Sequence, residues 1–130
     1  MGKLDKLGAI VTGTAEGIGE AIAKELAIQG AKVACLDFNK DAGQSTVNDI
    51  NESGGEALFI ETDIADPNQV KSSIETAASF LGSVDILVNN TGGPKAGFFD
   101  DLKDEDWVST FENTFLSVIR MTRAVLPSMK

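Results

Sequence analysis

The 130-residue sequence contains no histidine and no tyrosine, and it has one cysteine and three prolines. Without histidine, a serine–histidine–aspartate triad and a histidine-ligated metal site are excluded, and no metal centre is predicted. Without tyrosine, no phenolic group can exchange a proton with a substrate. Cys35 cannot form a disulfide within the chain, and its apolar neighbours Val33, Ala34 and Leu36 predict a buried side chain rather than a nucleophile.

Basic residues are scarce as well, with 11 Lys and Arg against 20 Asp and Glu, which gives a net charge of -9. Nucleic acids and anionic membrane surfaces need a basic face on their partner, so neither is an expected ligand. No run approaches the about 18 apolar residues of a membrane span, and the first residues resemble neither a signal peptide nor an acylation motif. The expected location is the cytoplasm.

Short strand-like runs alternate with segments of helical periodicity, which is the pattern of consecutive βαβ units. Strands are predicted at residues 7–12, 32–37, 57–61 and 84–89, and helices at about 18–29, 39–52, 66–81 and 104–127. Because crossovers between parallel strands are right-handed, the natural strand order is 3-2-1-4. The sequence therefore predicts one α/β domain over residues 1–130, a doubly wound Rossmann-type parallel sheet truncated at four strands.

Several side chains indicate where the helices begin, end and face the core. Asp66 followed by Pro67 predicts an N-cap and a first helical residue, and Gly30 and Gly82 are natural helix ends. Pro127 is predicted to end the last helix. The apolar stripe of the first helix is predicted to be formed by Ile18, Ile22 and Leu26. The apolar side of the last helix is predicted to comprise Trp107, Phe111, Phe115, Val118, Met121, Thr122 and Val125.

A glycine-bearing turn, residues 12–19 with the sequence TGTAEGIG, joins the first strand directly to the first helix. Its spacing differs from the common G-x-G-x-x-G dinucleotide fingerprint. The physical chemistry is shared, because glycine lets the backbone approach a pyrophosphate while the helix N-terminus offers free N–H groups and partial positive charge. Taken alone, three glycines also fit a tight turn without any ligand.

Asp37 ends the second predicted strand, where an acidic side chain can accept hydrogen bonds from the adenine ribose of NAD. A turn aspartate at a strand end is the alternative interpretation. The positions that would need a basic residue to pair with a 2′-phosphate hold Thr14, Ala15, Glu16 and Phe38. Because the carboxylates of Asp37 and Glu16 would repel that phosphate, NAD is predicted as the cofactor in preference to NADP.

Three motifs together resemble a classical short-chain dehydrogenase/reductase: T-G-x-x-x-G-I-G at residues 12–19, Asp63 after the third strand, and N-N-x-G at residues 89–92. Residues 89–94 are similar to bacterial members near the 3-oxoacyl-thioester reductase branch, with Thr91 where alanine is more usual. The similarity covers essentially all of residues 4–130. It implies hydride transfer between a nicotinamide cofactor and an alcohol or carbonyl substrate.

The resemblance also implies how single residues would contact the cofactor. Asp37 would bind the adenosine ribose, Asn90 and Gly92 would lie along the cofactor, and Asn89 would help to tie the sheet together. The pyrophosphate would be framed by Thr12, Gly13, Gly17, Ile18 and Gly19, and the adenine ring would be contacted by Asp63 and Ile64.

The reaction centre that the resemblance implies is incomplete within residues 1–130. Family members carry an asparagine seven residues after a tryptophan, and counted from Trp107 this position is Thr114, whereas Asn113 lies one residue early, about 100° around a regular helix. The catalytic serine and Tyr-x-x-x-Lys of the family belong to a C-terminal half that has no counterpart here. Residues 1–130 are therefore expected to bind the cofactor and to be inactive alone.

Two functions stay open at this point. The chain is either the cofactor-binding half of an NAD-dependent oxidoreductase or a non-catalytic nucleotide-binding or assembly module with the same glycine turn. A serine followed about a dozen residues later by Tyr-x-x-x-Lys, encoded beyond Lys130, would favour the first. The expected macromolecular partner is a second copy of the chain or a C-terminal half, and the substrate is not specified by this sequence.

Overall fold

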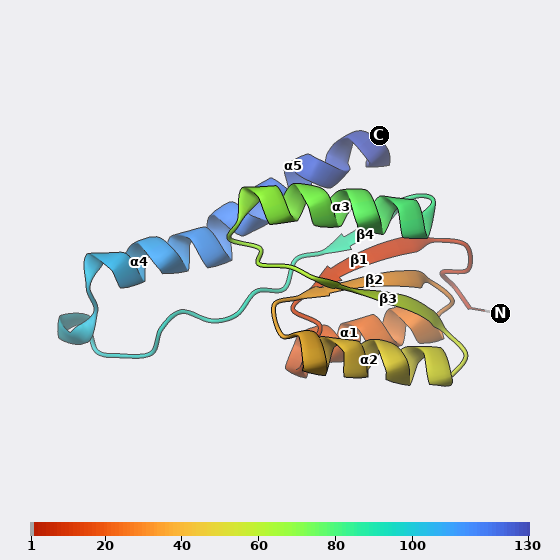
Figure 1. Cartoon of the computed structure of the whole chain (residues 1–130), viewed down its shortest axis with the longest axis horizontal. Coiled ribbons are helices and arrows are strands. Elements are labelled where there is room, and N and C mark those ends of the chain that lie inside the picture. The colour runs from red at the N-terminus through yellow and green to blue at the C-terminus, as the bar shows by residue number, and fades with distance from the viewer. Residues whose placement is uncertain (1) are drawn as a thin grey trace.

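The computed structural model describes residues 2–130, which form a four-stranded parallel sheet with helices on both faces (Figure 1). The strands lie in the order β3-β2-β1-β4 and are β1 (Gly8–Thr12), β2 (Lys32–Asp37), β3 (Glu56–Glu61) and β4 (Ile86–Val88). One face is covered by α1 (Gly17–Ile28) and α2 (Lys40–Glu52), and the other by α3 (Pro67–Leu81) and α5 (Ser117–Met129). The predicted fold class and strand order are confirmed.

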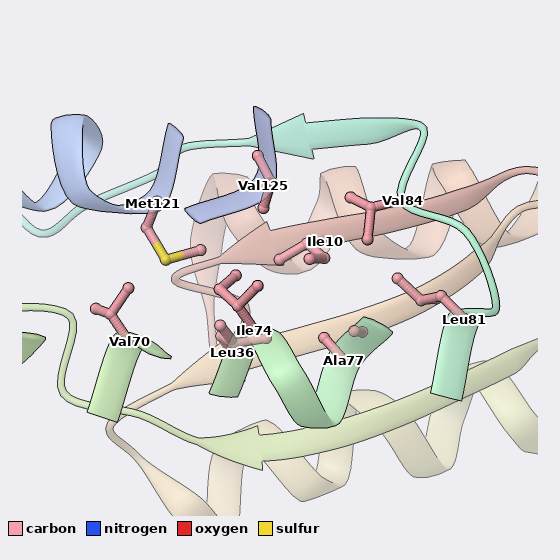
Figure 2. Close-up of a cluster of buried hydrophobic side chains, with 10 residues drawn as sticks. Ile10, Leu36, Val70, Ile74, Ala77, Leu81, Val84, Met121 and Val125 are labelled. Carbon is pink, nitrogen blue, oxygen red and sulfur yellow. The ribbon is translucent and has the colours of Figure 1, made fainter. Parts of the chain in front are cut away.

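Both faces of the central strands β1 and β2 are buried, because neighbouring residues in these strands point to opposite helical layers. Ile10, Ala34 and Leu36 pack with α3 and α5, and Figure 2 shows Met121 and Val125 of α5 in this cluster. The other cluster comprises Ala9, Val11, Ala23, Ala31, Val33, Cys35, Val47, Ile50 and Ala57. Each fully buried Val, Leu or Ile contributes about 1.5–3 kcal/mol, so these two layers fix the sheet between its helices.

The predicted helix signals hold at α1 and α3. The carboxylate of Asp66 accepts the backbone N–H groups of Asn68 and Gln69, and Pro67 occupies the first turn of α3. Gly82 follows α3 with φ 81°, a left-handed conformation that favours glycine. These contacts satisfy backbone groups that the helix ends would otherwise leave unpaired.

Ile18 is wrongly predicted as a core residue of α1. Its side chain is 73% exposed, whereas Gly19 and Ala23 are the buried positions of this helix and Ile22 and Leu26 are half-buried. Ile18 lies in the first turn of α1, directly after the turn that leaves β1, where the sheet no longer covers it. The predicted helical periodicity is therefore correct. Which apolar residues of that helix face are buried depends on how far the sheet extends beneath α1.

The C-terminal helical segment is longer and less regular than predicted. After a 3₁₀ turn, η1 (Phe99–Asp101), it runs through α4 (Asp104–Phe111), a π turn, η2 (Glu112–Leu116), and α5. The prediction that Pro127 ends this helix is wrong, since α5 continues to Met129 with the proline inside. Pro127 removes only the bond to the carbonyl of Arg123, an exposed residue in the last turns whose carbonyl water can reach.

Strand β4 is shorter than the predicted strand at 84–89, because its two ends are held by other contacts. At its start the N–H of Asp85 donates to the carbonyl of Gly8 at 2.8 Å, and the N–H of Gly8 donates to the Asp85 carboxylate at 2.8 Å. At its end, the hydroxyl of Thr12 pairs with the backbone of Asn90. Side-chain bonds thus replace the regular ladder at both ends.

The helix α4 extends away from the sheet in Figure 1. Large apolar side chains are exposed on α4 and on the following η2 turn. We call Trp107, Val108 and Phe111 of α4 and Phe115 of η2, each at least 50% exposed, the α4 apolar face. Within residues 2–130 no helix combines the length and the apolar character that crossing a membrane requires.

Candidate functional site

A cleft of about 750 Å³ lies at the carboxyl ends of the strands, where the strand order changes direction between β1 and β4. Open α/β sheets bind their ligands at this place, because the loops diverge there and leave a crevice. The cleft is lined by the glycine turn, the end of β2, the β3–α3 loop, the segment after β4, and the helix α4–η2. Among the predicted residues, its lining includes Gly13, Ile18, Asp37, Asp63, Ile64, Asn90 and Gly92.

The glycine turn is packed so tightly that its geometry depends on residues without side chains. Gly17 has φ 64°, which a larger residue adopts only with strain. A Cβ at Gly19 would lie 1.8 Å from the carbonyl oxygen of Gly13 and 2.6 Å from Nδ2 of Asn90. The turn can therefore fold back on itself at the start of α1, where the free N–H groups of the helix face outward.

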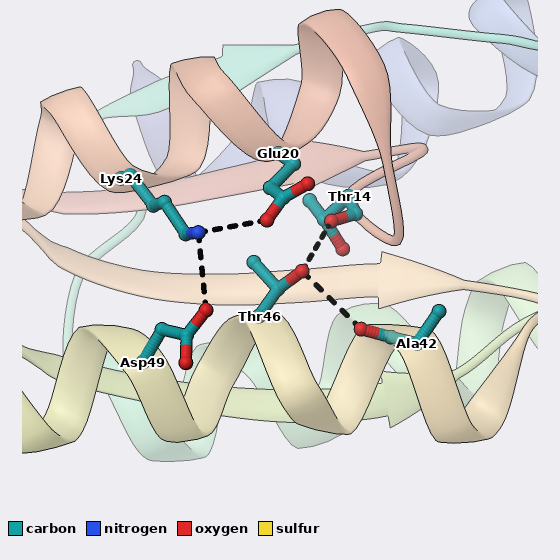
Figure 3. Close-up of polar contacts among 6 residues, drawn as sticks. All are labelled: Thr14, Glu20, Lys24, Ala42, Thr46 and Asp49. Carbon is teal, nitrogen blue, oxygen red and sulfur yellow. Dashed lines mark hydrogen bonds and ion pairs between the residues drawn. The ribbon is translucent and has the colours of Figure 1, made fainter.

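The helix α2 holds the glycine turn from the side, as Figure 3 shows. The Thr46 hydroxyl lies within hydrogen-bond distance of two carbonyl oxygens, that of Thr14 at 3.0 Å and that of Ala42 at 3.2 Å. Nearby, the Lys24 ammonium group of α1 pairs with Glu20 at 2.7 Å and with Asp49 of α2 at 3.1 Å, and these hydrogen bonds raise the pKa of Lys24. The i, i+4 pair of Glu20 and Lys24 within α1 therefore extends to the neighbouring helix α2.

The Asp37 carboxylate links the end of β2 to the glycine turn. Its Oδ2 accepts the backbone N–H of Ala15 at 2.9 Å, and its Oδ1 accepts the N–H of Asn39 at 2.8 Å. Each carboxylate oxygen has a second lone pair, so the half-buried group can still accept bonds from ligand hydroxyls. Asp37 therefore has a structural task in addition to the predicted contact with a ribose.

Asn90 ties the end of β4 to the end of β1. Its N–H donates to Oγ1 of Thr12 at 2.8 Å, and the same hydroxyl donates to the Asn90 carbonyl at 2.9 Å. Its side-chain Nδ2 donates to the Gly13 carbonyl at 3.1 Å. Asn90, rather than the predicted Asn89, makes these bonds, and Asn89 is exposed.

The β3–α3 loop brings Asp63 and Ile64 to the cleft. The Asp63 carboxylate accepts the N–H of Ala65 at 3.0 Å, and the Asp63 N–H donates to the side-chain oxygen of Gln69 at 2.9 Å. The first of these bonds closes an Asx turn, a common role of aspartate after a strand. The loop is therefore held against the start of α3 while Ile64 lines the cleft.

Three predicted residues do not line the cleft. Thr12 and Gly19, the two ends of the glycine turn, are buried, and Gly17 is exposed outside the lining. They shape the cleft by supporting the turn. Glu16 and Phe38, which the sequence analysis places where a 2′-phosphate would lie, also line the cleft. The sequence prediction missed further lining residues, which are chain neighbours of predicted positions or lie on one face of the C-terminal helix: Leu36, Thr62, Ala65, Thr91, Gly93, Ser109 and Glu112.

Asn113 lines the cleft together with Ser109 and Glu112, at the helical spacing i, i+3, i+4. Thr114, the position that counting from Trp107 selects, instead donates its hydroxyl to the Thr110 carbonyl at 2.6 Å. The count assumes a regular α-helix, whereas residues 112–116 form a π turn with i→i+5 bonds. The helical spacing of the polar residues Ser109, Glu112 and Asn113 is the sequence signal that could have identified this face of the C-terminal helix.

The electrostatic character of the cleft is negative. Its lining contains the carboxylates of Glu16, Asp37, Asp63 and Glu112, and no lysine or arginine stands among the lining residues. An anionic ligand group would therefore be held by backbone N–H groups and the N-terminal end of α1 rather than by a cationic side chain. An additional phosphate near Asp37 would meet like charge.

Cys35 takes no part in the cleft. Its side chain is fully buried in β2, and burial raises its pKa to about 12, although the Thr14 hydroxyl opposes the shift. A thiol of that kind stays protonated at neutral pH and is a poor nucleophile. The predicted structural role of Cys35 is confirmed.

Comparison of the sequence and the structure with known proteins shows the family of this chain. The family model described as short chain dehydrogenase matches residues 8–130. The chain belongs to the short-chain dehydrogenase family. It is 36% identical over 121 residues to the 3-oxoacyl-[acyl-carrier-protein] reductase FabG of Escherichia coli (strain K12), a match that covers 93% of this chain and 48% of that protein.

Other short-chain dehydrogenases are similar to the same degree. The 7alpha-hydroxysteroid dehydrogenase of E. coli (strain K12) is 37% identical over 128 residues, which is 98% of this chain and 50% of the relative. The solved structure of a 7alpha-hydroxysteroid dehydrogenase with NADH and 7-oxo glycochenodeoxycholic acid superposes with a TM-score of 0.93 at 37% identity, over 97% of this chain and 49% of that one. The chain thus spans about half the length of the relatives it matches.

The cleft contains open space beside two glycines. Where a Cβ would stand at Gly92 or Gly93, both of which line the cleft, nothing lies within 4 Å. A side chain at either position would project into open space. The glycines leave that space free, and the carboxylates of Asp37 and Asp63 supply hydrogen-bond acceptors in the same cleft.

Proposed function

We propose that residues 1–130 are the NAD-binding half of an oxidoreductase that transfers a hydride between the nicotinamide and an alcohol or carbonyl substrate. The observation that carries this proposal is the cleft at the β1/β4 switch point, with the glycine turn on one side and the Asp37 carboxylate at its end. Membership of the short-chain dehydrogenase family and the NADH in a related solved structure support it.

In this function each part of the cleft has its own task. The N–H groups at the start of α1 and the turn around Gly13 hold the pyrophosphate, and Asp37 accepts hydrogen bonds from the adenosine ribose. Asp63 and Ile64 border the adenine ring. Toward the other end, Gly92 gives the cofactor room, and Asn113 takes the position of the family's asparagine. The cofactor, when bound, supplies the hydride chemistry.

In the mechanism that the family resemblance implies, a tyrosine transfers the proton to the substrate oxygen, and residues 1–130 contain no tyrosine. The sequence has no tyrosine and no histidine, and the buried Cys35 thiol is protonated at neutral pH. General acid catalysis of this kind typically contributes about 10²–10⁴-fold. We therefore propose that this chain alone binds the cofactor without turnover and that the catalytic serine, tyrosine and lysine are supplied by a C-terminal half.

The preference for NAD over NADP tests this proposal. Fluorescence titration of the chain with NADH and with NADPH is expected to give tighter binding of NADH, because Asp37 and Glu16 repel a 2′-phosphate. In Asp37→Asn the amide oxygen can keep one of the two backbone bonds, and we expect NADH affinity to fall by about threefold to tenfold. Equal binding of both cofactors by the wild type would contradict the preference, and binding of neither would contradict the function.

A further inference from the structure

Arg120 connects the C-terminal helix to the loop at the adenosine end of the cleft. Its guanidinium Nη1 donates to the backbone carbonyl of Ala65 at 3.0 Å, across 55 residues of sequence. Both residues are half-buried, so the bond is partly shielded from water. The planar guanidinium suits this task, since its fixed donors hold one direction where an ammonium group would swivel.

Apart from the backbone bond from the Thr62 N–H to the Asp37 carbonyl at the end of β2, at 2.9 Å, the β3–α3 loop otherwise bonds to its own neighbourhood. Asp63 bonds to Ala65 and to Gln69, and the Thr62 hydroxyl pairs with the Ser73 hydroxyl at 2.7 Å. These partners belong to the loop itself or to α3. Among the side-chain hydrogen bonds within residues 2–130, the one from Arg120 alone joins this loop to α5.

Ala65 lines the cleft together with Thr62, Asp63 and Ile64, and it directly precedes Asp66, the N-cap of α3. A displaced Ala65 carbonyl would therefore move Asp63 and Ile64 with it. The carbonyl is also flanked in the chain by two carboxylates, which favour a cation at this position. In Figure 1 this loop passes from β3 to the start of α3, which packs beside α5.

We propose that Arg120 is a positioning residue for adenosine recognition: it fixes the Ala65 carbonyl and thereby sets Asp63 and Ile64 against the adenine side of the cofactor. The inference rests on the proposed function, because it assigns the β3–α3 loop to the adenosine end. Since α5 continues directly from the turn that carries Asn113, Arg120 also joins the two ends of the cleft through one helix.

The test separates the two halves of the cofactor. AMP and nicotinamide mononucleotide are titrated separately into the wild type and into Arg120→Met, which keeps an unbranched apolar stem but removes the donors, with NMR shifts as the readout. We expect AMP affinity to fall by about fivefold, the loss of part of one charge-assisted hydrogen bond, and the mononucleotide affinity to stay unchanged. The matched control is Arg123→Met, an exposed arginine on the same helix, which is expected to change neither.

Arg120→Lys keeps the charge and serves as the second variant, with an expected AMP affinity between those of the wild type and Arg120→Met. If both variants change only the melting temperature, or weaken both mononucleotides equally, Arg120 is merely structural and the inference is overturned. If Arg120→Met does not fold, unchanged AMP binding in Arg120→Lys overturns it. Failure of the wild type to bind AMP, the mononucleotide and NADH would instead remove the proposed function, and the inference with it.

Discussion

Gly19 shows how a single residue sets the shape of the cleft. It lies where the glycine turn closes onto α1, with the Gly13 carbonyl and the Asn90 side chain occupying the space of a Cβ. Gly92 has the opposite surroundings, because nothing lies within 4 Å of its Cβ position although it lines the same cleft. The two glycines therefore serve different purposes, one for packing and one for access.

This difference predicts opposite outcomes for the two alanine variants. Gly19→Ala should lower the free energy of unfolding by about 1–3 kcal/mol, because backbone atoms of Gly13 must move. Gly92→Ala should leave stability within about 0.5 kcal/mol and weaken NADH binding, since the methyl group enters the cleft. Urea unfolding and NADH titration of both variants give the measurement. Unchanged stability in Gly19→Ala would show that the turn is more adaptable than its packing indicates.

For single residues, the sequence predicts well which positions belong to the cleft. It predicts less well which hydrogen bonds each of them makes. Gly13, Asp37 and Asn90 line the cleft as predicted, because the motifs that select them follow strand ends. The second bond of Asp37, to Ala15, and the choice of Asn90 over Asn89 depend on which atoms of distant segments meet. Such contacts are set by tertiary packing, and the local spacing of residues in the sequence carries no information about it.

Among the elements, β4 is the least supported by its own ladder. It pairs with β1 at only three positions and has no strand beyond it within residues 2–130. Its start depends on Asp85, whose carboxylate accepts the Gly8 N–H and the Ser83 hydroxyl, and these bonds lower the pKa of Asp85. The backbone of Asn90 secures the other end.

The lowered pKa of Asp85 makes the attachment of β4 dependent on pH. The ionised form is favoured in the folded state, so its contribution is complete above the unfolded pKa of about 3.9 and is lost as pH falls through the lower folded pKa. Asp85→Asn should therefore melt at a lower temperature than the wild type at pH 7, and the difference should shrink below about pH 4. Melting curves at pH 7, 5 and 3 test this, with the exposed Asp100→Asn as control. A difference that persists unchanged at pH 3 would contradict the role of the charge.

The order of elements follows from periodicity and turn residues, whereas their irregularities do not. Helix starts such as Asp66 are encoded locally, and the structure confirms them. The π turn at residues 112–116, the continuation of α5 past Pro127 and the short β4 depend on partners far away in the sequence. A prediction from local sequence patterns assumes regular helices and strands, so it does not find these irregular segments.

At the level of the whole molecule, the α4 apolar face is a group of large apolar side chains that the fold leaves exposed to solvent. Its four large side chains, on α4 and η2, are at least half exposed where the chain extends away from the sheet, and within residues 2–130 no strand pairs with the outer edge of β4. Contiguous apolar surface and an open strand edge are the usual sites of association. The net charge of -9 opposes contact, but salt screens it within about 8 Å.

We therefore expect residues 1–130 to form a dimer or a larger species at micromolar concentration, or a complex with a C-terminal half. Light scattering should report a mass above that of one 13.7 kDa chain. Phe111→Glu with Phe115→Glu should shift the mass toward the monomer, whereas the matched pair Ser45→Glu with Asn48→Glu on the exposed side of α2 should not. A monodisperse wild-type monomer would show that the α4 apolar face needs no cover.

The glycine turn is held from three different elements before any ligand arrives: by Asp37 of β2, by Thr46 of α2 and by Asn90 after β4. Its conformational entropy is therefore lost during folding, and little remains to be lost when a dinucleotide binds. Preorganisation of this kind couples affinity to the integrity of the whole sheet. Partial loosening of any of the three supports will weaken binding at temperatures well below global unfolding.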